Sequence, residues 1–540
     1  MNHTLLIPSA RLVVPELQAD FGAIPPALLP LGHASVLERI LQQTPVDEAL
    51  IGAHEGSDDV QDLVSNQRLD ARVVDVGATD SLGQTVFRCL EQAQAEGHVI
   101  VQFADTLVSG GLPGPDTVDF QWAAHGFRWT TFDVDAEGRL DGIRDRFTTA
   151  RLERQRAFIG RFCFADRNLL RHHLHTQLEA RRGRLDPFYA ALLEYDRDRR
   201  LQPVEQSGWD DVGHVDTYYD TRRRQVSQSR FFNEVAVDRH RGTITKRSSR
   251  PDVLRNELAW YRALPQEVAH VAPRVFASNL EPGATAGIEI EYYSYPSMND
   301  LLVHGKKDWG FWHQALDALG EILDDFLAHP GPKDPATVQV ACQAMYVDKT
   351  LARLDDLAHQ RPELVDAQVR INNQEPTSLR ALRDRIRPAV EASGLLDPGR
   401  FSIVHGDLCA SNILYDYRNR VVRLIDPRGD FGGFNPYGDP TYDLAKLSHS
   451  FHGGYDHIQS SRCQSVRDGD AVTLTILRDD SDIQALFEVW LAKRAPDIGA
   501  IRLAEALLFL SMLPLHSDRP AIQEHLAMRG IELFQEATAC

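Results

Sequence analysis

Short apolar runs alternate with longer amphipathic stretches over the first 220 residues of the chain. The apolar runs lie at residues 5–7, 49–52, 71–76 and 98–103. Between them, residues 35–42 and 81–95 repeat their apolar positions with the period of a helix. Strands that alternate with helices predict an α/β domain with a largely parallel sheet. Asp105 follows the fourth run, at the sheet edge where such domains bind ligands.

A different pattern follows residue 400. Two strand-like segments, residues 401–404 and 421–425, flank a polar loop, and a carboxylate stands at the end of the second segment. Residues 483–490 and 500–512 then carry the apolar spacing of amphipathic helices. The loop is therefore presented between two short extended segments, close to a second acidic side chain.

Length and composition narrow the possibilities. A chain of 540 residues exceeds one ordinary core, and 43% hydrophobic with 25% charged residues is typical of globular proteins. The longest apolar run near the C-terminus, residues 506–515, is shorter than the roughly 20 residues that span a bilayer. The first residues lack the basic and apolar segments of a signal peptide. We therefore expect a cytoplasmic protein of two or more domains without membrane insertion.

The charge balance limits the partners. Acidic side chains outnumber basic ones by 77 to 58, which gives a net charge of −19. Such a charge opposes general binding to nucleic acid or to anionic lipid. We therefore expect no nucleic-acid partner.

The strongest chemical signal lies in residues 405–414, which read His-Gly-Asp-Leu-Cys-Ala-Ser-Asn-Ile-Leu, with Ile-Asp following at 425–426. Phosphoryl transfer needs a carboxylate that accepts the proton of the acceptor hydroxyl, and oxygen ligands that hold Mg²⁺ against the phosphates. Asp407 suits the first role, and Asn412 with Asp426 suits the second. These motifs resemble the catalytic loop and the metal element of the aminoglycoside phosphotransferase and choline kinase-like family. The resemblance implies a two-lobed, protein-kinase-like α+β fold that uses ATP and Mg²⁺.

The same family carries a lysine on a small-lobe strand and a glutamate on the following helix, an ion pair that holds the donor phosphates. Lys246, in the predicted strand 242–247, and Glu257, in the predicted helix 253–261, match these two positions. Glu291 lies in residues 288–293, a segment that resembles the hinge strand, whose backbone would bind the purine. The resemblance therefore extends upstream of the catalytic loop.

The loop that should cover the phosphates departs from the family pattern, because residues 222–233 contain no glycine. Ser227, Ser229 and Arg230 could bind phosphate through their side chains. The alternative is a solvated basic linker between two domains.

Two further residues follow Asp426. Asp443 lies in an Asp-Leu-Ala helix start that resembles the family's brace for the catalytic loop. Arg428 suggests an acceptor with an anionic or hydroxyl-rich group.

The first 220 residues resemble the sugar-1-phosphate nucleotidylyltransferases at two places. Residues 24–32 are similar to the region where a Pro-Lys-Pro-Leu-like motif precedes the first long helix, and residues 208–219 to the closing Trp-x-Asp-x-Gly-Thr element. The resemblance implies a Rossmann-like domain in which Asp105 and Asp211 hold Mg²⁺, an ion that prefers hard oxygen ligands. The alternative for Asp105 is a helix cap.

This domain also departs from its family. Residues 9–14 contain no glycine, although the family loop needs glycine to bring backbone N–H groups close to the triphosphate. Pro26 stands where the motif has lysine. The domain therefore either transfers nucleotides without that loop, or keeps the fold and binds a ligand or a partner subunit.

Together these patterns predict a nucleotidylyltransferase-like domain over residues 1–222 and a kinase-like domain over 223–540, with lobes at about 223–300 and 301–540. The leading function is ATP-dependent phosphorylation of a hydroxyl on a sugar, polyol or related metabolite, for surface-polysaccharide precursors. The alternatives are a bifunctional kinase and nucleotidylyltransferase, and a non-catalytic nucleotide-binding scaffold. The expected partners are the hydroxyl acceptor and a nucleoside triphosphate, and an oligomer is compatible with the sequence.

Overall fold

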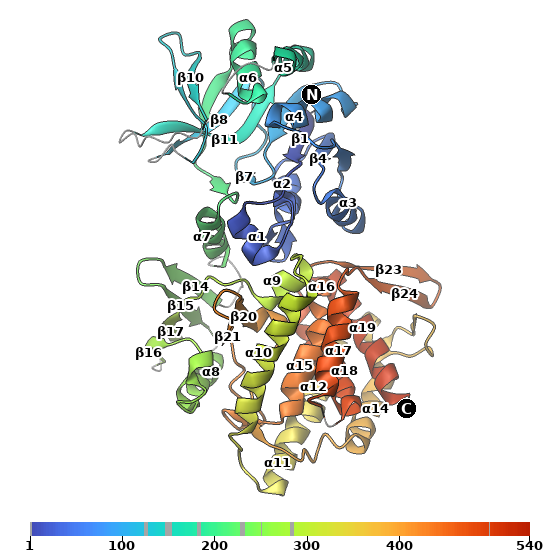
Figure 1. Cartoon of the computed structure of the whole chain (residues 1–540). Helices are drawn as coiled ribbons and strands as arrows, with labels where there is room; N and C mark the ends of the chain where they lie inside the picture. Colours follow the sequence, from blue (N-terminus) through green and yellow to red (C-terminus); the bar gives the residue numbers. More distant parts are fainter. Residues whose placement is uncertain are drawn as a thin grey trace. The chain divides into compact units, whose positions relative to one another are not determined.

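The computed structural model describes residues 3–123, 128–145, 154–180, 185–226, 233–249, 251–280, 286–495 and 497–539. The chain divides into two compact units, Met1–Gln225 and Val226–Cys540 (Figure 1). Ser227, Ser229 and Arg230, expected near the donor phosphates, fall outside the described residues.

The sheet of the first unit is parallel at its centre. β1 (His3–Ser9) pairs in parallel with β4 (Glu48–Ala53) on one side and with β6 (His98–Gln102) on the other, and β5 (Arg72–Asp75) continues beside β4. The helices between these strands are α2 (Val36–Gln43), α3 (Ser57–Asn66) and α4 (Leu82–Gln92). Leu5, Leu6 and Ile7 are fully buried, as in strands that are covered on both faces. The predicted strand–helix alternation is confirmed here.

Beyond β6 the same sheet becomes antiparallel. β11 (Gln155–Phe164) runs against β6, β8 (Thr117–Ala123) and β9 (Thr131–Val134). The sheet is therefore mixed: the prediction of a largely parallel sheet holds for its β5-β4-β1-β6 part, and β12 (Gln202–Glu205) also pairs in parallel, with β8. A separate pair, β7 (Thr106–Val108) with β13 (Trp209–Asp211), brings the segment after β6 beside the end of the unit.

The second unit begins with a small antiparallel sheet. Its strands lie in the order β14 (Asn233–Asp238), β15 (Thr243–Ser248), β17 (Ala286–Glu291) and β16 (Val275–Asn279). Along β17 buried and partly exposed residues alternate, which is the pattern of a sheet covered on one face. α8 (Pro251–Ala263) contacts β17.

The rest of the second unit is mainly helical (Figure 1). Its long helices include α10 (Trp309–Leu327), α12 (Lys349–Gln360), α15 (Pro440–Phe451), α18 (Ile498–Met512) and α19 (Pro520–Thr538). Two short strand pairs frame the polar loop: β19 (Ser402–Ile403) with β22 (Tyr437–Gly438), and β20 (Ile413–Asp416) with β21 (Val421–Leu424). A small sheet followed by a helical lobe is the predicted two-lobed α+β fold, which is confirmed.

One helical stretch of the described residues, Ile498–His516, is long and apolar enough to cross a membrane. Of its most apolar window, 67% is buried within the protein. The α18 part of this stretch packs against α12, α15 and α19. Helices of this length and composition occur both as membrane spans and in protein cores. The burial of this stretch is typical of a core helix.

Candidate active site

The polar loop of the second unit is anchored by α15. Asp443 accepts hydrogen bonds from the backbone N–H groups of His405 (2.7 Å) and Gly406 (2.8 Å). Gly406 has a φ of +77°, and a Cβ there would lie 3.0 Å from the Cβ of Arg428. Glycine is therefore required at this turn on both counts. The predicted bracing contact of Asp443 is confirmed.

His405 is a fully buried part of the loop. Its Nε2 lies 3.0 Å from the carbonyl oxygen of Ile425, and the backbone N–H of Asp407 donates to its Nδ1 at 3.3 Å. Burial lowers the pKa of His405 to about 4. The ring is therefore neutral at physiological pH, with Nε2 as its donor and Nδ1 as its acceptor.

Asp407 projects from the loop and is 41% exposed. Its Oδ1 lies 2.8 Å from Nζ of Lys446 on α15, and Nδ2 of Asn412 donates to its Oδ2 at 3.2 Å. Burial alone would raise the pKa of Asp407, but the charge of Lys446 outweighs it and holds the pKa below its usual range. Asp407 is therefore ionised at neutral pH, as a proton acceptor must be.

Lys246 on β15 connects two carboxylates that are distant in sequence. Its Nζ lies 2.7 Å from Oε1 of Glu257 on α8, and it also forms an ion pair with Asp426. The hydroxyl of Tyr261 donates to the same Glu257 oxygen at 3.0 Å. Burial alone would lower the pKa of Lys246, but the two carboxylates outweigh it and raise the pKa. The structure thus brings Lys246, Glu257 and Asp426 together.

Asp426 and Asn412 have the chemistry of a Mg²⁺ site. Asp426 is 50% exposed and has a φ of +55°, a left-handed conformation that clusters at functional sites. Asn412 uses its amide nitrogen to bond Asp407, and its amide oxygen is a hard ligand. The described residues contain no cluster of three or more His, Cys, Asp or Glu that could hold a metal. Mg²⁺ needs only one or two protein oxygens beside substrate phosphates, so Asn412 and Asp426 fit this ion.

Glu291 ends β17, the strand predicted as the hinge. Its backbone N–H donates to the carbonyl oxygen of Arg274 at 2.9 Å, and its Oε2 accepts from the hydroxyl of Tyr293 at 2.8 Å. The N–H of Tyr292 donates to the carbonyl oxygen of Gly242. These N–H groups are used within the sheet, and a purine-binding role for Glu291 stays a prediction.

Sequence reasoning missed Lys446, which pairs with Asp407, and the neighbouring pair of Tyr442 and Lys349. Tyr442 and Lys446 are four residues apart on α15, and so share a helix face. Nζ of Lys349 donates to the hydroxyl of Tyr442 at 2.8 Å across 93 residues of sequence. The spacing of Tyr442 and Lys446 could have predicted that they share a helix face. The contact of Tyr442 with Lys349 could not be predicted from the sequence.

In the first unit, Asp105 and Asp211 lie against the same residue. A Cβ on Gly213 would be 2.5 Å from Oδ2 of Asp105 and 3.3 Å from Oδ1 of Asp211. Asp211 also accepts hydrogen bonds from the N–H of Gly213 (2.9 Å) and the hydroxyl of Thr217 (3.0 Å), and its Oδ2 lies 2.8 Å from Nδ1 of His214. The structure brings the two predicted carboxylates together, and Mg²⁺ binding would have to replace some of these bonds.

The loop after β1 is already engaged. Oε2 of Glu55 accepts a hydrogen bond from the backbone N–H of Leu12 at 3.2 Å, and Arg11 donates to the carbonyl oxygen of Asp80 at 3.3 Å. A carboxylate at this N–H repels a triphosphate electrostatically. The loop therefore lacks glycine and is also contacted by an acidic side chain, Glu55, from the segment after β4.

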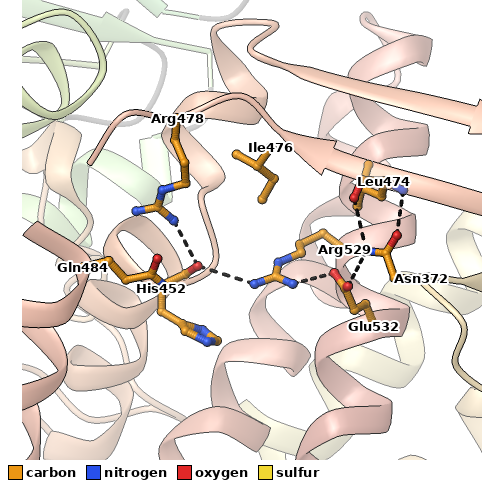
Figure 2. Close-up of a pocket in the computed structure, with 8 residues that line it drawn as sticks. All are labelled: Asn372, His452, Leu474, Ile476, Arg478, Gln484, Arg529 and Glu532. Carbon is orange, nitrogen blue, oxygen red and sulfur yellow. Dashed lines mark hydrogen bonds and ion pairs between the residues drawn. The ribbon is translucent and has the colours of Figure 1, made fainter. Parts of the chain in front are cut away.

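A pocket of about 210 Å³ lies elsewhere in the second unit (Figure 2). Arg478 and Arg529 both donate to the carbonyl oxygen of His452, while Asn372 donates to Glu532 at 2.6 Å. None of the predicted site residues lines it. Several of its polar groups bond one another or neighbouring residues outside the pocket.

Comparison with known families supports the reading of the second unit. Residues 223–460 match the model of a family described as the phosphotransferase enzyme family. This match confirms the predicted resemblance and the phosphotransferase class for that part of the chain. No curated protein matches the chain significantly.

Solved structures of two kinds are similar to the chain. CTP:phosphocholine cytidylyltransferase of Streptococcus pneumoniae is 11% identical over 41% of this chain and 98% of its own (TM-score 0.34). HddC of Yersinia pseudotuberculosis, complexed with GMP-PN, is 12% identical over 42% and 99% (TM-score 0.31). Aminoglycoside phosphotransferase APH(3'')-Id of Streptomyces rimosus, in complex with ADP and streptomycin, is 18% identical over 52% and 90% (TM-score 0.34).

Proposed function

We propose that this chain is an ATP-dependent small-molecule kinase that phosphorylates a hydroxyl of a sugar, polyol or related metabolite. The observation that carries the proposal is the ion pairing of Lys246, on the small sheet, with Glu257 and with Asp426, in the turn after β21, in a unit whose catalytic loop presents Asp407 to Lys446. The phosphotransferase family match over residues 223–460 supports the reaction class.

Each residue has a step in the transfer. Lys246, held by Glu257, binds the donor phosphates. Asp407 accepts the proton of the acceptor hydroxyl while the hydroxyl oxygen bonds the γ-phosphorus and the bond to ADP breaks. Asn412 and Asp426 are the residues that would hold Mg²⁺, which when bound neutralises phosphate charge.

A bifunctional kinase and nucleotidylyltransferase is the second candidate. The observation that favours it is the meeting of Asp105 and Asp211 at Gly213. A kinase makes a phosphomonoester, and a nucleotidylyltransferase consumes one to give an activated precursor, such as those used for surface polysaccharides. The engagement of the Leu12 N–H by Glu55 counts against it. A non-catalytic scaffold, the third candidate, would not need the charged set around Asp407.

The test uses the full chain with ATP, Mg²⁺ and a panel of sugars, polyols, sugar acids and amino alcohols. We expect acceptor-dependent ADP release and a phosphorylated product from the wild type and from Asp468→Asn, a matched control at an exposed position of β23 (Cys463–Asp468). Asp407→Asn should give both at a rate lower by about 10² to 10⁴. The proposal fails if no acceptor supports ADP release, or if Asp407→Asn is as active as the wild type.

A further inference from the structure

A row of polar side chains leads from Asp407 along α15. Lys446 pairs with Asp407 at 2.8 Å, and one turn earlier the hydroxyl of Tyr442 accepts from Nζ of Lys349 at 2.8 Å. The Lys349 ammonium also lies 4.8 Å from the centre of the Tyr442 ring, within the range of a cation–π contact. Lys349 is the first residue of α12. Two cations thus lie on the large-lobe side of the proposed base.

Arg428 adds a third cation. Its backbone N–H donates to the carbonyl oxygen of His405 at 3.0 Å, and its Nε donates to the carbonyl oxygen of Asp430 at 3.0 Å. The positive charge of Arg428 contributes to lowering the pKa values of Asp407, Tyr442 and Lys349. The Arg428 side chain lies against the loop next to Asp407, because a Cβ on Gly406 would be 3.0 Å from its Cβ and 3.6 Å from its Cδ.

This cluster has more positive than negative charge. In the described part of the chain the structure pairs neither Lys349 nor Arg428 with a carboxylate; Lys349 bonds a hydroxyl and Arg428 a carbonyl oxygen. Burial lowers the pKa of Lys349 to about 8. Burial alone would raise the pKa of Tyr442, but Lys349, Arg428 and Lys446 outweigh it and lower the pKa to about 8. Gathering cations without a counter-charge costs free energy, and such clusters mark functional sites.

We propose that Lys349, Arg428 and Tyr442 form the acceptor subsite, and that the acceptor carries an anionic group, a carboxylate or a phosphate, near the hydroxyl that is phosphorylated. This inference rests on the proposed kinase function. The anion supplies the counter-charge that Lys349 and Arg428 lack, while Lys446 holds Asp407. The donor phosphates belong to Lys246, which lies on β15 of the small sheet. A cationic acceptor, such as an amino alcohol, is repelled by the same charges.

A binding experiment tests the subsite without knowledge of the acceptor. The full chain is first saturated with Mg²⁺ and a non-hydrolysable ATP analogue, so that the γ-phosphate position is filled. Inorganic phosphate is then titrated calorimetrically into the wild type, Lys349→Met and Lys493→Met. Lys493, at the exposed end of α17 (Ser481–Ala492), is the matched control. We expect phosphate to bind the wild type and the control, and binding to weaken about 10- to 100-fold in Lys349→Met, the scale of one charged hydrogen bond.

Turnover of matched acceptors gives the second readout. Glycerate is compared with glycerol, glucuronate with glucose, and choline serves as the cationic acceptor. We expect the acidic member of a pair to have the higher kcat/KM, and Lys349→Met to raise its KM while the KM for ATP stays within about twofold.

The outcomes separate the two proposals. Three results would overturn the anionic subsite and leave the kinase proposal intact. They are phosphate binding that is absent or does not depend on Lys349, preferred phosphorylation of a neutral or cationic acceptor, and a changed KM for ATP in Lys349→Met. If no acceptor is phosphorylated at all, while phosphate binds in a Lys349-dependent manner, the kinase proposal fails instead.

Discussion

Burial raises the pKa of Asp407 and the charge of Lys446 lowers it. The effect of Lys446 is the larger, so Asp407 is ionised. We expect Asp407→Asn to lower kcat by about 10² to 10⁴, the contribution of a positioned general base. Nucleotide affinity should stay nearly unchanged, because the base acts on the acceptor and not on ATP. Steady-state kinetics with a calorimetric Kd for ATP measures both, and wild-type turnover would remove Asp407 from its role.

The conformation of Asp426 determines which substitution tests it. Asparagine tolerates the left-handed φ of +55°, so Asp426→Asn removes the charge without the backbone strain that alanine would add. We expect the variant to lose the Mg²⁺ dependence of ATP binding together with activity. Calorimetric titrations of ATP with and without Mg²⁺ measure this. Tight binding that still depends on Mg²⁺ would contradict the assignment.

His405 links stability to pH. The native ring is neutral, with a pKa lowered to about 4, whereas the ring in the unfolded chain takes up a proton below about 6.5. Its contribution to stability is therefore complete above pH 6.5 and decreases as the pH falls toward 4, by about 2 kcal/mol at pH 5. In urea unfolding at pH 7.5 and 5, His405→Asn should show a smaller loss of stability than the wild type. His313→Asn, on the exposed side of α10, should keep the full loss.

At the residue scale, the sequence predicted the residues of the proposed reaction, but not the side chains that surround them in the fold. Asp407, Asn412 and Asp426 were readable because their chemistry requires fixed residue types at short spacing. Lys349 could not be recognised from the sequence, since its partner Tyr442 lies 93 residues away and the two meet only in the folded chain. Long-range pairs between helices leave no local pattern in a sequence.

At the scale of elements, α15 organises the loop of the proposed base. Its N-cap Asp439 accepts from the N–H of Thr441 at 2.9 Å and from the hydroxyl of Tyr346 at 2.7 Å. Asp443 then binds two loop N–H groups, and Lys446 holds Asp407. One helix therefore orders the backbone of the loop and orients its carboxylate.

Removing the Asp443 carboxylate leaves two buried N–H groups without their acceptor. We expect Asp443→Ala to lower the free energy of unfolding by about 2 to 6 kcal/mol, from about 1 to 3 for each of the two unsatisfied groups. Asp443→Asn keeps one acceptor oxygen and should restore part of both stability and kcat. Urea unfolding and turnover of the two variants measure this. Equal stability of Asp443→Ala and wild type would contradict the bracing role.

Elements differ in how far the sequence revealed them. The parallel strands β1, β4, β5 and β6 were predicted because each is an apolar run separated from the next by a helix. The antiparallel strands β8, β9 and β11 were not, because their pairing is set by contacts between distant segments. Alternation in a sequence identifies strands, but it does not fix which strands pair.

At the scale of the whole molecule, two units with different folds share one chain. In the kinase-like unit the structure joins Lys246 to Glu257 and Asp426, and Asp407 to Asn412, whereas the residues expected to cover the donor phosphates fall outside the described part of the chain. The first unit keeps the two carboxylates but lacks the glycine loop, and Glu55 engages an N–H of that loop.

Nucleotidyl transfer by the first unit is tested in the full chain by pyrophosphate release from a nucleoside triphosphate and a panel of sugar phosphates. Backbone donors that stabilise developing charge contribute about 10² to 10³ in rate each, so their loss after β1 should leave no appreciable release. We expect any nucleotide binding to the first unit to be weak, to require Mg²⁺, and to be abolished by Asp105→Ala, with kinase turnover unchanged.

Asp62→Ala, on the exposed side of α3, is the matched control for that experiment and should behave as the wild type. Pyrophosphate release that depends on Asp105 would favour the bifunctional kinase and nucleotidylyltransferase. The two carboxylates would then act without the glycine loop. In that case Glu55→Gln should increase the release, since it removes the negative charge from the Leu12 N–H. If Asp105→Ala changes neither nucleotide binding nor kinase turnover, the first unit is a structural or assembly domain.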